Sequence, residues 1–321
     1  MLGPMGARLI DGKALAAGIL ERVRLQRAAL GRVTPRLVSI YVGDDPASAI
    51  YIRNQRRSCE RMEIRFDLDH LPPATSEGEL VDHIQALNAD ESVTGILLQR
   101  PLPPQIRQLR AQSKILPDKD VEGLNPANIG SIVYGMPKLV PCTALAAVRC
   151  MRSTGIPLRG ADVVMIGHSE VVGKPIAFLM LNEFATCTIC HVATHDLATK
   201  TRHADVVFTA VGKPGLLTGA MLKPGAVVID IGIRQVAQLD PVGAPMRGED
   251  GHPLYRLAGD VDFASAKEVA GWITPVPGGV GPVTVAMLVH NVVMAARMLA
   301  GLPIEPAFAD GPASRADPAA R

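Results

Sequence analysis

Residues 161–181 read ADVVMIGHSEVVGKPIAFLML, and this stretch decides the fold expected for the second half of the chain. The apolar run 161–166 predicts a strand, 167–175 a glycine-bearing loop, and the residues from 176 the start of a helix. That order aims backbone N–H groups and a helix N-terminus at a phosphate. Ser169 takes the place of the second glycine of a full dinucleotide fingerprint, so a purely structural turn is an alternative for this segment alone.

Three more short apolar runs follow, at 186–192, 204–211 and 226–232, and each is followed by glycine or a polar turn. This repetition predicts a doubly wound, Rossmann-type nucleotide-binding domain. An acidic residue about 20 positions after the loop would suit a ribose hydroxyl. Here the acid comes late, at Asp196, so the choice between NAD and NADP stays open.

The first third of the chain is also an α/β unit. The runs 36–42 and 93–99 predict buried parallel strands. Asp11 is placed to cap a helix that runs to about residue 30, and Ser76 and Glu79 form a capping box before a second helix. At its other end the chain carries the turn-rich run 274–284, an apolar helix from 285 to about 299, and a Pro- and Ala-rich tail predicted to be disordered.

Composition narrows the class of protein. With 321 residues the chain is long enough for two domains. A net charge of +2 and 3% aromatic residues give little basis for nucleic-acid binding. A continuous apolar run of about 18 residues and a secretory signal are both missing, which predicts a cytoplasmic protein without a membrane span.

The cysteines predict neither a disulfide framework nor a metal site. Their number, five, is odd. Cys187 and Cys190 have the spacing of a metal or redox pair, but residues three apart on a strand point to opposite faces.

The segment 48–55, SAIYIRNQ, follows the turn GDDP and predicts the start of a helix. Tyr51 and Gln55 are four residues apart and would share one face of it. Gln99 ends a predicted strand just before Pro101, at the edge where open α/β sheets bind ligands. The loop 117–125 adds further carboxylates. Taken alone, the helix could be a solvated surface helix and the loop a surface turn.

Together these segments resemble one family closely, the bifunctional methylenetetrahydrofolate dehydrogenase/methenyltetrahydrofolate cyclohydrolases, over about residues 8 to 300. The matching runs are VGDDPAS (42–48) with Tyr51, GILLQRPLP (95–103), KDVEG (119–123), PCT (141–143), GHS (167–169) with VG (172–173), TAVGKPG (209–215), VIDIG (228–232), GDV (259–261) and TPVPGGVGPVT (274–284).

The resemblance implies two α/β domains with a folate cleft between them. It implies a folate-binding catalytic domain over 1–140, completed by the helix 285–301, a nicotinamide-dinucleotide-binding domain over 141–284, and a tail over 302–321. Cytoplasmic homodimers are usual in the family. The site residues that it implies are Tyr51, Gln55, Gln99 and Glu122 for catalysis, Tyr51, Gln99, Pro101, Leu102, Asp120, Pro277, Gly278 and Gly281 for the folate, and Gly167, His168, Ser169, Gly173, Lys174, Ile233 and Thr284 for NADP or NAD.

Several positions depart from the family pattern. Gln55 stands where the family has its catalytic lysine, and Glu122 replaces an aspartate. Ala144 replaces a usual proline, while His168 and Val192 occupy cofactor-loop positions where other residue types are common. The last two leave the preference for NADP in question.

The two reactions of the family make different demands. Hydride transfer needs mainly positioning of the folate against the nicotinamide. Hydrolysis of the methenyl cation needs a group that titrates near the working pH, which a lysine can supply and a glutamine cannot. The sequence therefore predicts a dehydrogenase whose cyclohydrolase step is weak or lost. A fully bifunctional enzyme, with Glu122 or Tyr51 covering the role of the lysine, and a repurposed folate- or nucleotide-binding protein without redox turnover are the alternatives.

Overall fold

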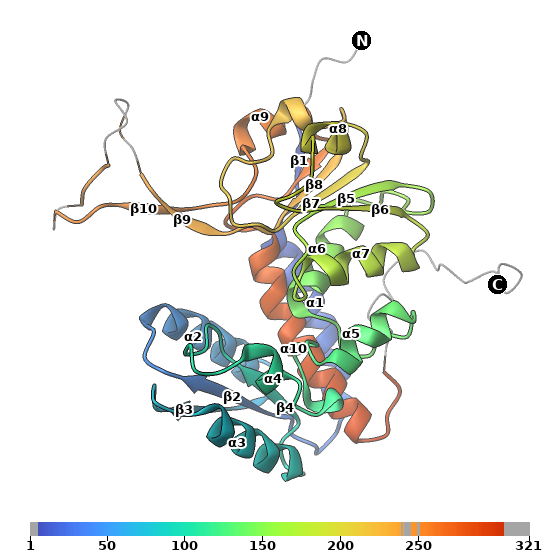
Figure 1. The fold of residues 1–321 in the computed structure, drawn as a ribbon. Coiled ribbons are helices and arrows are strands. Elements are labelled where there is room, and N and C mark those ends of the chain that lie inside the picture. Colours follow the sequence, from blue (N-terminus) through green and yellow to red (C-terminus); the bar gives the residue numbers. More distant parts are fainter. Residues whose placement is uncertain (1–5, 239, 241–244, 249–250, 305–321) are drawn as a thin grey trace, which may run out of the picture. The chain divides into compact units, whose positions relative to one another are not determined.

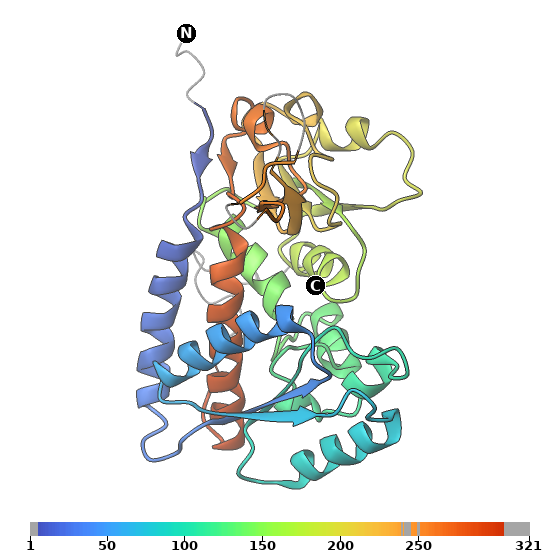
Figure 2. The ribbon, with the colours of Figure 1, turned by 90° about the vertical axis from the view of Figure 1, so that its left-hand side faces the viewer.

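A computed structural model describes residues 6–238, 240, 245–248 and 251–304 (Figures 1 and 2). The chain forms two compact units. The six-stranded unit holds the described residues of Met1–Leu15 and Ala146–Val283, and the three-stranded unit holds those of Ala16–Leu145 and Thr284–Arg321. Most of the tail predicted to be disordered, 305–321, lies outside the described residues.

The three-stranded unit is a small parallel sheet in the order β3-β2-β4. Figures 1 and 2 show α2 on one face of this sheet and α3 on the other. Its elements are α1 (Gly12–Ala28), β2 (Arg36–Val42), α2 (Pro46–Glu60), β3 (Arg65–Leu71), α3 (Glu77–Ala89), β4 (Gly95–Leu98), α4 (Gln108–Gln112), the 3₁₀ turn η1 (Pro117–Lys119), α5 (Pro126–Val133) and α10 (Val280–Leu299), with α1 and α10 each containing a boundary between the units.

The sequence signals for this unit are confirmed. Strand β2 has the predicted bounds and β4 is shorter than expected. Asp11 accepts hydrogen bonds from the backbone of Lys13 and Ala14, so it caps α1. The reciprocal capping box of Ser76 and Glu79 is present at the start of α3. The buried face of α3 packs with β2 and β4 in one apolar core, which fixes the carboxyl ends of these strands.

The six-stranded unit is a parallel sheet in the order β1-β11-β8-β7-β5-β6. Figure 1 shows α7 on one face, with α8 and α9 on the other. Its elements are β1 (Arg8–Leu9), α6 (Cys142–Arg152), β5 (Asp162–Ile166), α7 (Gly173–Asn182), β6 (Thr186–Cys190), α8 (Leu197–Thr201), β7 (Val206–Thr209), the 3₁₀ turn η2 (Gly219–Met221), β8 (Val227–Asp230), β9 (Arg234–Ala237), β10 (Tyr255–Ala258), α9 (Phe263–Lys267) and β11 (Trp272–Ile273). Helix α6 also contains a boundary, and its residues up to Leu145 belong to the three-stranded unit.

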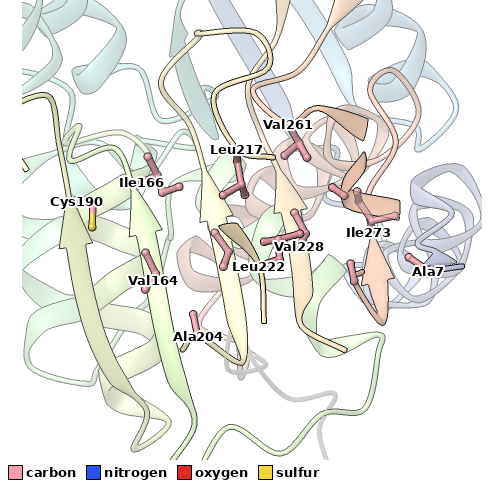
Figure 3. Packing of buried hydrophobic residues seen from close by; sticks show 13 residues of the cluster. Ala7, Val164, Ile166, Cys190, Ala204, Leu217, Leu222, Val228, Val261 and Ile273 are labelled. Atoms are coloured by element: carbon pink, nitrogen blue, oxygen red, sulfur yellow. The ribbon is translucent and has the colours of Figure 1, made fainter. Parts of the chain in front are cut away.

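The core of this unit lies along the sheet. Figure 3 shows Val164 of β5, Val228 of β8 and Ile273 of β11 in one cluster, with Ala7 joining from the N-terminal segment. This packing and the pairing of β1 with β11 explain why residues 6–15 group with the second half of the chain, whereas the expected boundary placed them in the first domain. The strand order turns at β5, which lies between β6 and β7. This is the kind of position where open α/β sheets bind ligands.

Two helices begin earlier than predicted. Helix α7 starts at Gly173 rather than at residue 176, because proline is tolerated in the first turn and Pro175 therefore does not delay it. Helix α10 starts at Val280 rather than at 285, with Pro282 again in the first turn. The prolines and glycines there were read only as turn formers.

The polar connection expected over 233–258 contains an antiparallel pair instead. Strands β9 and β10 form a separate two-stranded ribbon, with Leu257 opposite Gln235 and Tyr255 opposite Ala237. Figure 1 shows this ribbon projecting away from the six-stranded sheet. Residues 234–237 read RQVA and 255–258 read YRLA, so these short strands lack a clear alternation of polar and apolar residues that could have predicted them.

Helix α10 is the one helix among the described residues that could span a membrane by length and composition. The sequence prediction counted only uninterrupted apolar runs and did not single it out. Inside the protein, 67% of its most apolar window is buried, as in the core helix of a globular protein.

Lys119 ties the loop after η1 to the end of α3. Its ammonium donates to the backbone oxygens of Leu87 (3.1 Å), Asn88 (2.8 Å) and Asp90 (2.7 Å). The residue is buried, and this burial lowers the pKa of the Lys119 side chain. A positive charge therefore completes the C-terminus of α3, where the last carbonyls of a helix need donors.

Substitution Lys119→Met removes this donor and keeps an apolar side chain of similar length. Three carbonyl groups lose a partner, so we expect the free energy of unfolding to fall by about 1–3 kcal/mol. Equilibrium urea unfolding measures the change. The exposed Lys114 provides the control, because Lys114→Met should alter the free energy by less than about 0.5 kcal/mol. Equal effects of the two substitutions would contradict the assigned role.

Candidate functional site

Three polar side chains form a hydrogen-bonded chain at the carboxyl end of the three-stranded sheet. Gln99 directly follows β4 and is 7% exposed, and its backbone N–H donates to Ile40 of β2 (2.9 Å). Its side-chain Nε2 donates both to Oε1 of Gln55 (2.6 Å) and to Oγ of Ser39 (2.9 Å). Two of the predicted site residues, from segments 44 positions apart, are thereby brought into direct contact.

The other folate candidates of this edge differ in exposure. Tyr51 lies one turn before Gln55 on α2 and is 57% exposed, so its phenol is accessible. Pro101 is also exposed. Leu102 is half-buried and packs against the core of the unit, so part of its side chain has a structural role.

Glu122 and Arg100 form an ion pair beside this edge. Arg100 Nη2 lies 3.1 Å from Glu122 Oε1, and the side chain of Glu122 is only 16% exposed. Among the described residues the other oxygen of Glu122, Oε2, is buried without a hydrogen-bond partner. Burial raises the pKa of the Glu122 carboxyl, and the positive charge of Arg100 opposes that rise. Arg100 has no role assigned by the sequence analysis.

Asp120 is held differently from Glu122, two residues away. It is fully buried, and its oxygens accept from the side chain of Gln112 and from the backbone N–H of Asn125 and the amide of Asn128. Burial raises the pKa of the Asp120 carboxyl against these donors. Its assignment as a folate contact stays a prediction, and the visible role of the carboxylate is to fix its own loop.

The strand, glycine-bearing loop and helix predicted over 161–181 are present as β5, a loop and α7. Gly167 ends the strand with φ +115°, and a Cβ on Gly173 would lie 2.1 Å from the backbone oxygen of Gly167. Glycine at 173 therefore lets the start of α7 approach the strand end closely. Ser169 accepts at Oγ from the N–H of Val172 (3.2 Å), and Lys174 pairs with Glu170 (2.8 Å).

A second segment of the same edge follows β6. The rings of His168 and His191 lie 5.1 Å apart between centroids, which brings the loops after β5 and β6 together. Val192 is fully exposed there. Asp196, the late acidic residue, caps α8 by accepting from the backbone and the hydroxyl of Thr199.

Two buried aspartates order the neighbouring loops. Asp230 ends β8 and accepts backbone N–H groups from Gly232, Asp260 and Val261, each at 3.0 Å. Asp260 accepts from Val211 (2.7 Å), from Lys213 (2.6 Å) and from the hydroxyl of Thr209, which ends β7. Burial raises the pKa of the Asp230 carboxyl to about 6. The sequence analysis missed both roles, although each aspartate lies next to an apolar run in a motif that it quoted.

The remaining candidates lie in other segments. Ile233 follows the aspartate-ordered loop and is 52% exposed. Pro277 and Gly278 belong to the turn before α10, where the oxygen of Gly278 accepts from the backbone of Gly12 (3.1 Å). Gly281 and Thr284 lie in the first turns of α10. Across the described residues, histidine, cysteine and acidic side chains form no group of three or more that could hold a metal ion.

Two family models match the chain. The model described as "Tetrahydrofolate dehydrogenase/cyclohydrolase, catalytic domain" matches residues 10–122. The model described as "Tetrahydrofolate dehydrogenase/cyclohydrolase, NAD(P)-binding domain" matches residues 141–300. Together they span most of both units.

Individual relatives are similar over nearly their whole length. The "Bifunctional protein FolD" of Bordetella petrii is 48% identical, over 93% of this chain and 97% of its own. The protein of the same name from Rhodobacter capsulatus is 50% identical, over 90% of this chain and 93% of its own. Among solved structures, the Trypanosoma brucei methylenetetrahydrofolate dehydrogenase-cyclohydrolase, complexed with NADP and an inhibitor, has a TM-score of 0.82 at 38% identity, over 91% of this chain and 98% of its own.

Substitution Gly173→Ala tests the loop before α7. The added methyl group must displace the backbone at Gly167, and a displacement near 1 Å can cost about 10²-fold. We expect the dissociation constant of a reduced nicotinamide cofactor, measured by its fluorescence, to rise by roughly 10- to 100-fold.

Gly18 in α1 is the control, because a Cβ there meets no atom within 4 Å. Gly18→Ala should raise the free energy of unfolding by about 0.5–1 kcal/mol and leave cofactor binding unchanged. Unchanged cofactor binding in a folded Gly173→Ala protein would exclude this loop from the binding site.

Proposed function

The chain belongs to the tetrahydrofolate dehydrogenase/cyclohydrolase family, and we propose that it oxidises 5,10-methylenetetrahydrofolate to 5,10-methenyltetrahydrofolate with its hydrolase step weak or lost. It is an enzyme of one-carbon folate metabolism that uses NADP or NAD. The residues of this chain decide which of the two family reactions it can catalyse.

The residue at position 55 carries the proposal. Hydrolysis requires a group that gives and takes protons near the working pH, and a carboxamide does not titrate there. The amide of Gln55 is also occupied, since Oε1 accepts from Gln99 at 2.6 Å. Loss of a general acid–base group typically costs about 10²–10⁴-fold in rate, which is the size of the predicted defect.

Hydride transfer makes no such demand. The carbon that gives up hydride lies between two nitrogens that stabilise the resulting cation, so the step needs orientation rather than a proton carrier. The accessible Tyr51, the fixed Gln99 and the close-packed loop before α7 are suited to orienting the two reactants. The nicotinamide group itself supplies the hydride acceptor when bound.

A fully bifunctional enzyme is the second candidate, and one observation favours it. Burial raises the pKa of the Glu122 carboxyl above its ordinary value, which is the direction that a proton-transferring carboxyl requires. The third candidate, a binding protein without redox turnover, is separated from both by folate-dependent reduction of NADP or NAD, which it would not catalyse.

The homodimer and the cytoplasmic location stay part of the proposal. On the ribbon of β9 and β10, Tyr255 and Leu257 alternate onto one face and are 57% and 37% exposed. An isolated two-stranded ribbon is marginal in water, so a second copy of the chain is the partner that we propose for this face. All five cysteines are free thiols, which suits the reducing cytoplasm.

Substitution Gln55→Lys tests the missing proton carrier. We expect hydrolysis of methenyltetrahydrofolate, followed by its absorbance, to rise by at least about tenfold toward the 10²–10⁴-fold that acid–base groups supply. Folate-dependent reduction of the nicotinamide cofactor should stay within a few-fold. Gln55→Met matches the length without a titrating group and should give no gain in hydrolysis.

If the wild type already hydrolyses methenyltetrahydrofolate as fast as it forms it, the proposed loss is wrong and the bifunctional candidate holds. If neither cofactor is reduced in the presence of methylenetetrahydrofolate, the dehydrogenase assignment itself fails.

The ribbon is tested by size-exclusion chromatography with light scattering. The double substitution Tyr255→Lys and Leu257→Lys places two charges on the proposed contact face and should convert dimer to monomer. Arg256 alternates to the other face of β10, so Arg256→Gln should leave the mass unchanged. A dimer that survives the double substitution is held by another surface.

A further inference from the structure

We propose that Glu122 is the proton-transfer group of the folate site and that Arg100 positions its carboxylate and favours the charged form. This inference rests on the proposed function. Neither the family match nor any relative's name assigns a role to Arg100. The weak hydrolysis of the methenyl cation that this protein retains is thereby assigned to Glu122.

Two neighbouring titratable side chains, Lys119 and Asp120, are buried and committed to the fold. The ammonium of Lys119 is bound to three backbone oxygens. The carboxylate of Asp120 accepts from Gln112, Asn125 and Asn128. Glu122 contrasts with both, because one of its oxygens is engaged by Arg100 and the other is buried without a partner among the described residues.

A buried oxygen without a partner is costly, typically by about 1–3 kcal/mol. Native proteins keep such groups where a ligand, a water molecule or catalysis makes use of them. Oε2 of Glu122 therefore keeps its capacity to accept a proton, whereas the oxygens of the neighbouring Asp120 are already engaged.

The backbone that carries Glu122 is firmly held. Gly123 has φ +72°, and a Cβ there would lie 2.4 Å from the carbonyl carbon of Val140, so only glycine fits. Asn291 of α10 donates to the oxygens of Val121 (2.9 Å) and Val140 (3.0 Å). The backbone N–H of Cys142 also donates to the oxygen of Glu122 itself (3.3 Å), which ties this main chain to the start of α6.

Arg100 reaches the carboxylate from the neighbouring segment. It follows Gln99, whose side chain holds Gln55, so the ion pair and the glutamine pair stem from consecutive residues at the end of β4. A register change in this segment would move both together. Arginine stays protonated, so it acts on Glu122 as a fixed charge and cannot transfer protons itself.

Three titratable or charged groups act on Glu122. Arg100, at the end of β4, lowers the pKa of its carboxyl, and Asp120, in its own loop, raises it. The third is the buried thiol of Cys142 at the start of α6, which donates to the oxygen of Val121 (3.3 Å). Arg100 is the one group of these three that favours the carboxylate, so removing it should make Glu122 bind its proton more tightly.

Hydrolysis of the methenyl cation proceeds in two steps. The oxygen of a water molecule bonds to the methenyl carbon while one of its protons passes to the carboxylate of Glu122. The carbon–nitrogen bond to one ring nitrogen then breaks, Glu122 returns a proton to that nitrogen, and the hydroxyl proton leaves to solvent. The sum is methenyl cation plus water giving the formyl compound and one proton.

The experiment measures methenyltetrahydrofolate hydrolysis as a function of pH, with the uncatalysed rate subtracted, in full-length wild type and variants. Glu122→Gln should lower the protein-dependent rate by roughly 10²-fold or more. Arg100→Met should move the pH midpoint of that rate upward by about 1–3 units, the effect expected from losing a nearby cation. Arg100→Lys keeps the charge and should stay near the wild-type midpoint.

The matched control is Arg107→Met. Arg107 pairs with Glu77 at 2.8 Å in the same unit, and this arginine is exposed. Loss of that pair should leave the pH midpoint unchanged. A merely structural role of Arg100 would lower rates without moving the midpoint, so the midpoint separates the two explanations.

The inference is overturned if Glu122→Gln hydrolyses as fast as the wild type, if Arg100→Met keeps the wild-type midpoint, or if neither wild type nor Arg100→Met accelerates hydrolysis at all. Dehydrogenase assays on the same samples report separately on the proposed function. If the wild type reduces the cofactor but fails these hydrolysis criteria, the inference about Glu122 and Arg100 is wrong and the dehydrogenase assignment stands.

Discussion

Parallel strand pairing is the constraint on which both units depend. It sends the carboxyl end of every strand in a sheet to one edge, where the chain leaves the hydrogen-bonded ladder and turns. Gln99 follows β4, Gly167 follows β5, and Asp230 ends β8. Within each unit the buried apolar strands fix these positions, so side chains distant in the sequence, such as Gln55 and Gln99, can come into contact.

Buried charged groups need hydrogen-bond partners, and the buried charged groups of this protein differ in how many they have. Lys119, Asp120, Asp230 and Asp260 each have at least three hydrogen-bond partners around a single charged group. Such groups rigidify the loops that carry them, because every alternative arrangement leaves a buried polar group unpaired. Glu122 is the exception within its segment, with one oxygen unpaired. That contrast, rather than the presence of a carboxylate, distinguishes a group available for chemistry from one that holds the fold.

The sequence was most informative where one local signal decides the outcome. Apolar runs located β2, β5, β7 and β8, and the capping residues Asp11 and Ser76 located helix starts, because each signal acts within a few residues. The predicted starts of α7 and α10 were too late because of their prolines. A proline breaks the interior of a helix, but it is tolerated in the first turn. The Gln55–Gln99 contact and the Arg100–Glu122 pair span 44 and 22 positions, and no local pattern encodes which polar side chains meet at that distance. The structural roles of Lys119 and Asp120 could not be predicted for the same reason. A loop rich in charged residues is expected to be exposed to solvent unless its packing is known.

The hydrogen-bond direction at position 55 explains how the framework tolerates glutamine there. An ammonium group at this position could only donate, so Gln99 would have to offer its carbonyl oxygen. Gln55 accepts instead, and Gln99 donates both to it and to Ser39. An amide can turn to present either group, and a hydroxyl can donate or accept, so Gln99 and Ser39 can satisfy either residue without moving the backbone. A lysine and a glutamine at position 55 would therefore differ in their capacity for proton transfer, while the surrounding amide and hydroxyl groups could pair with either.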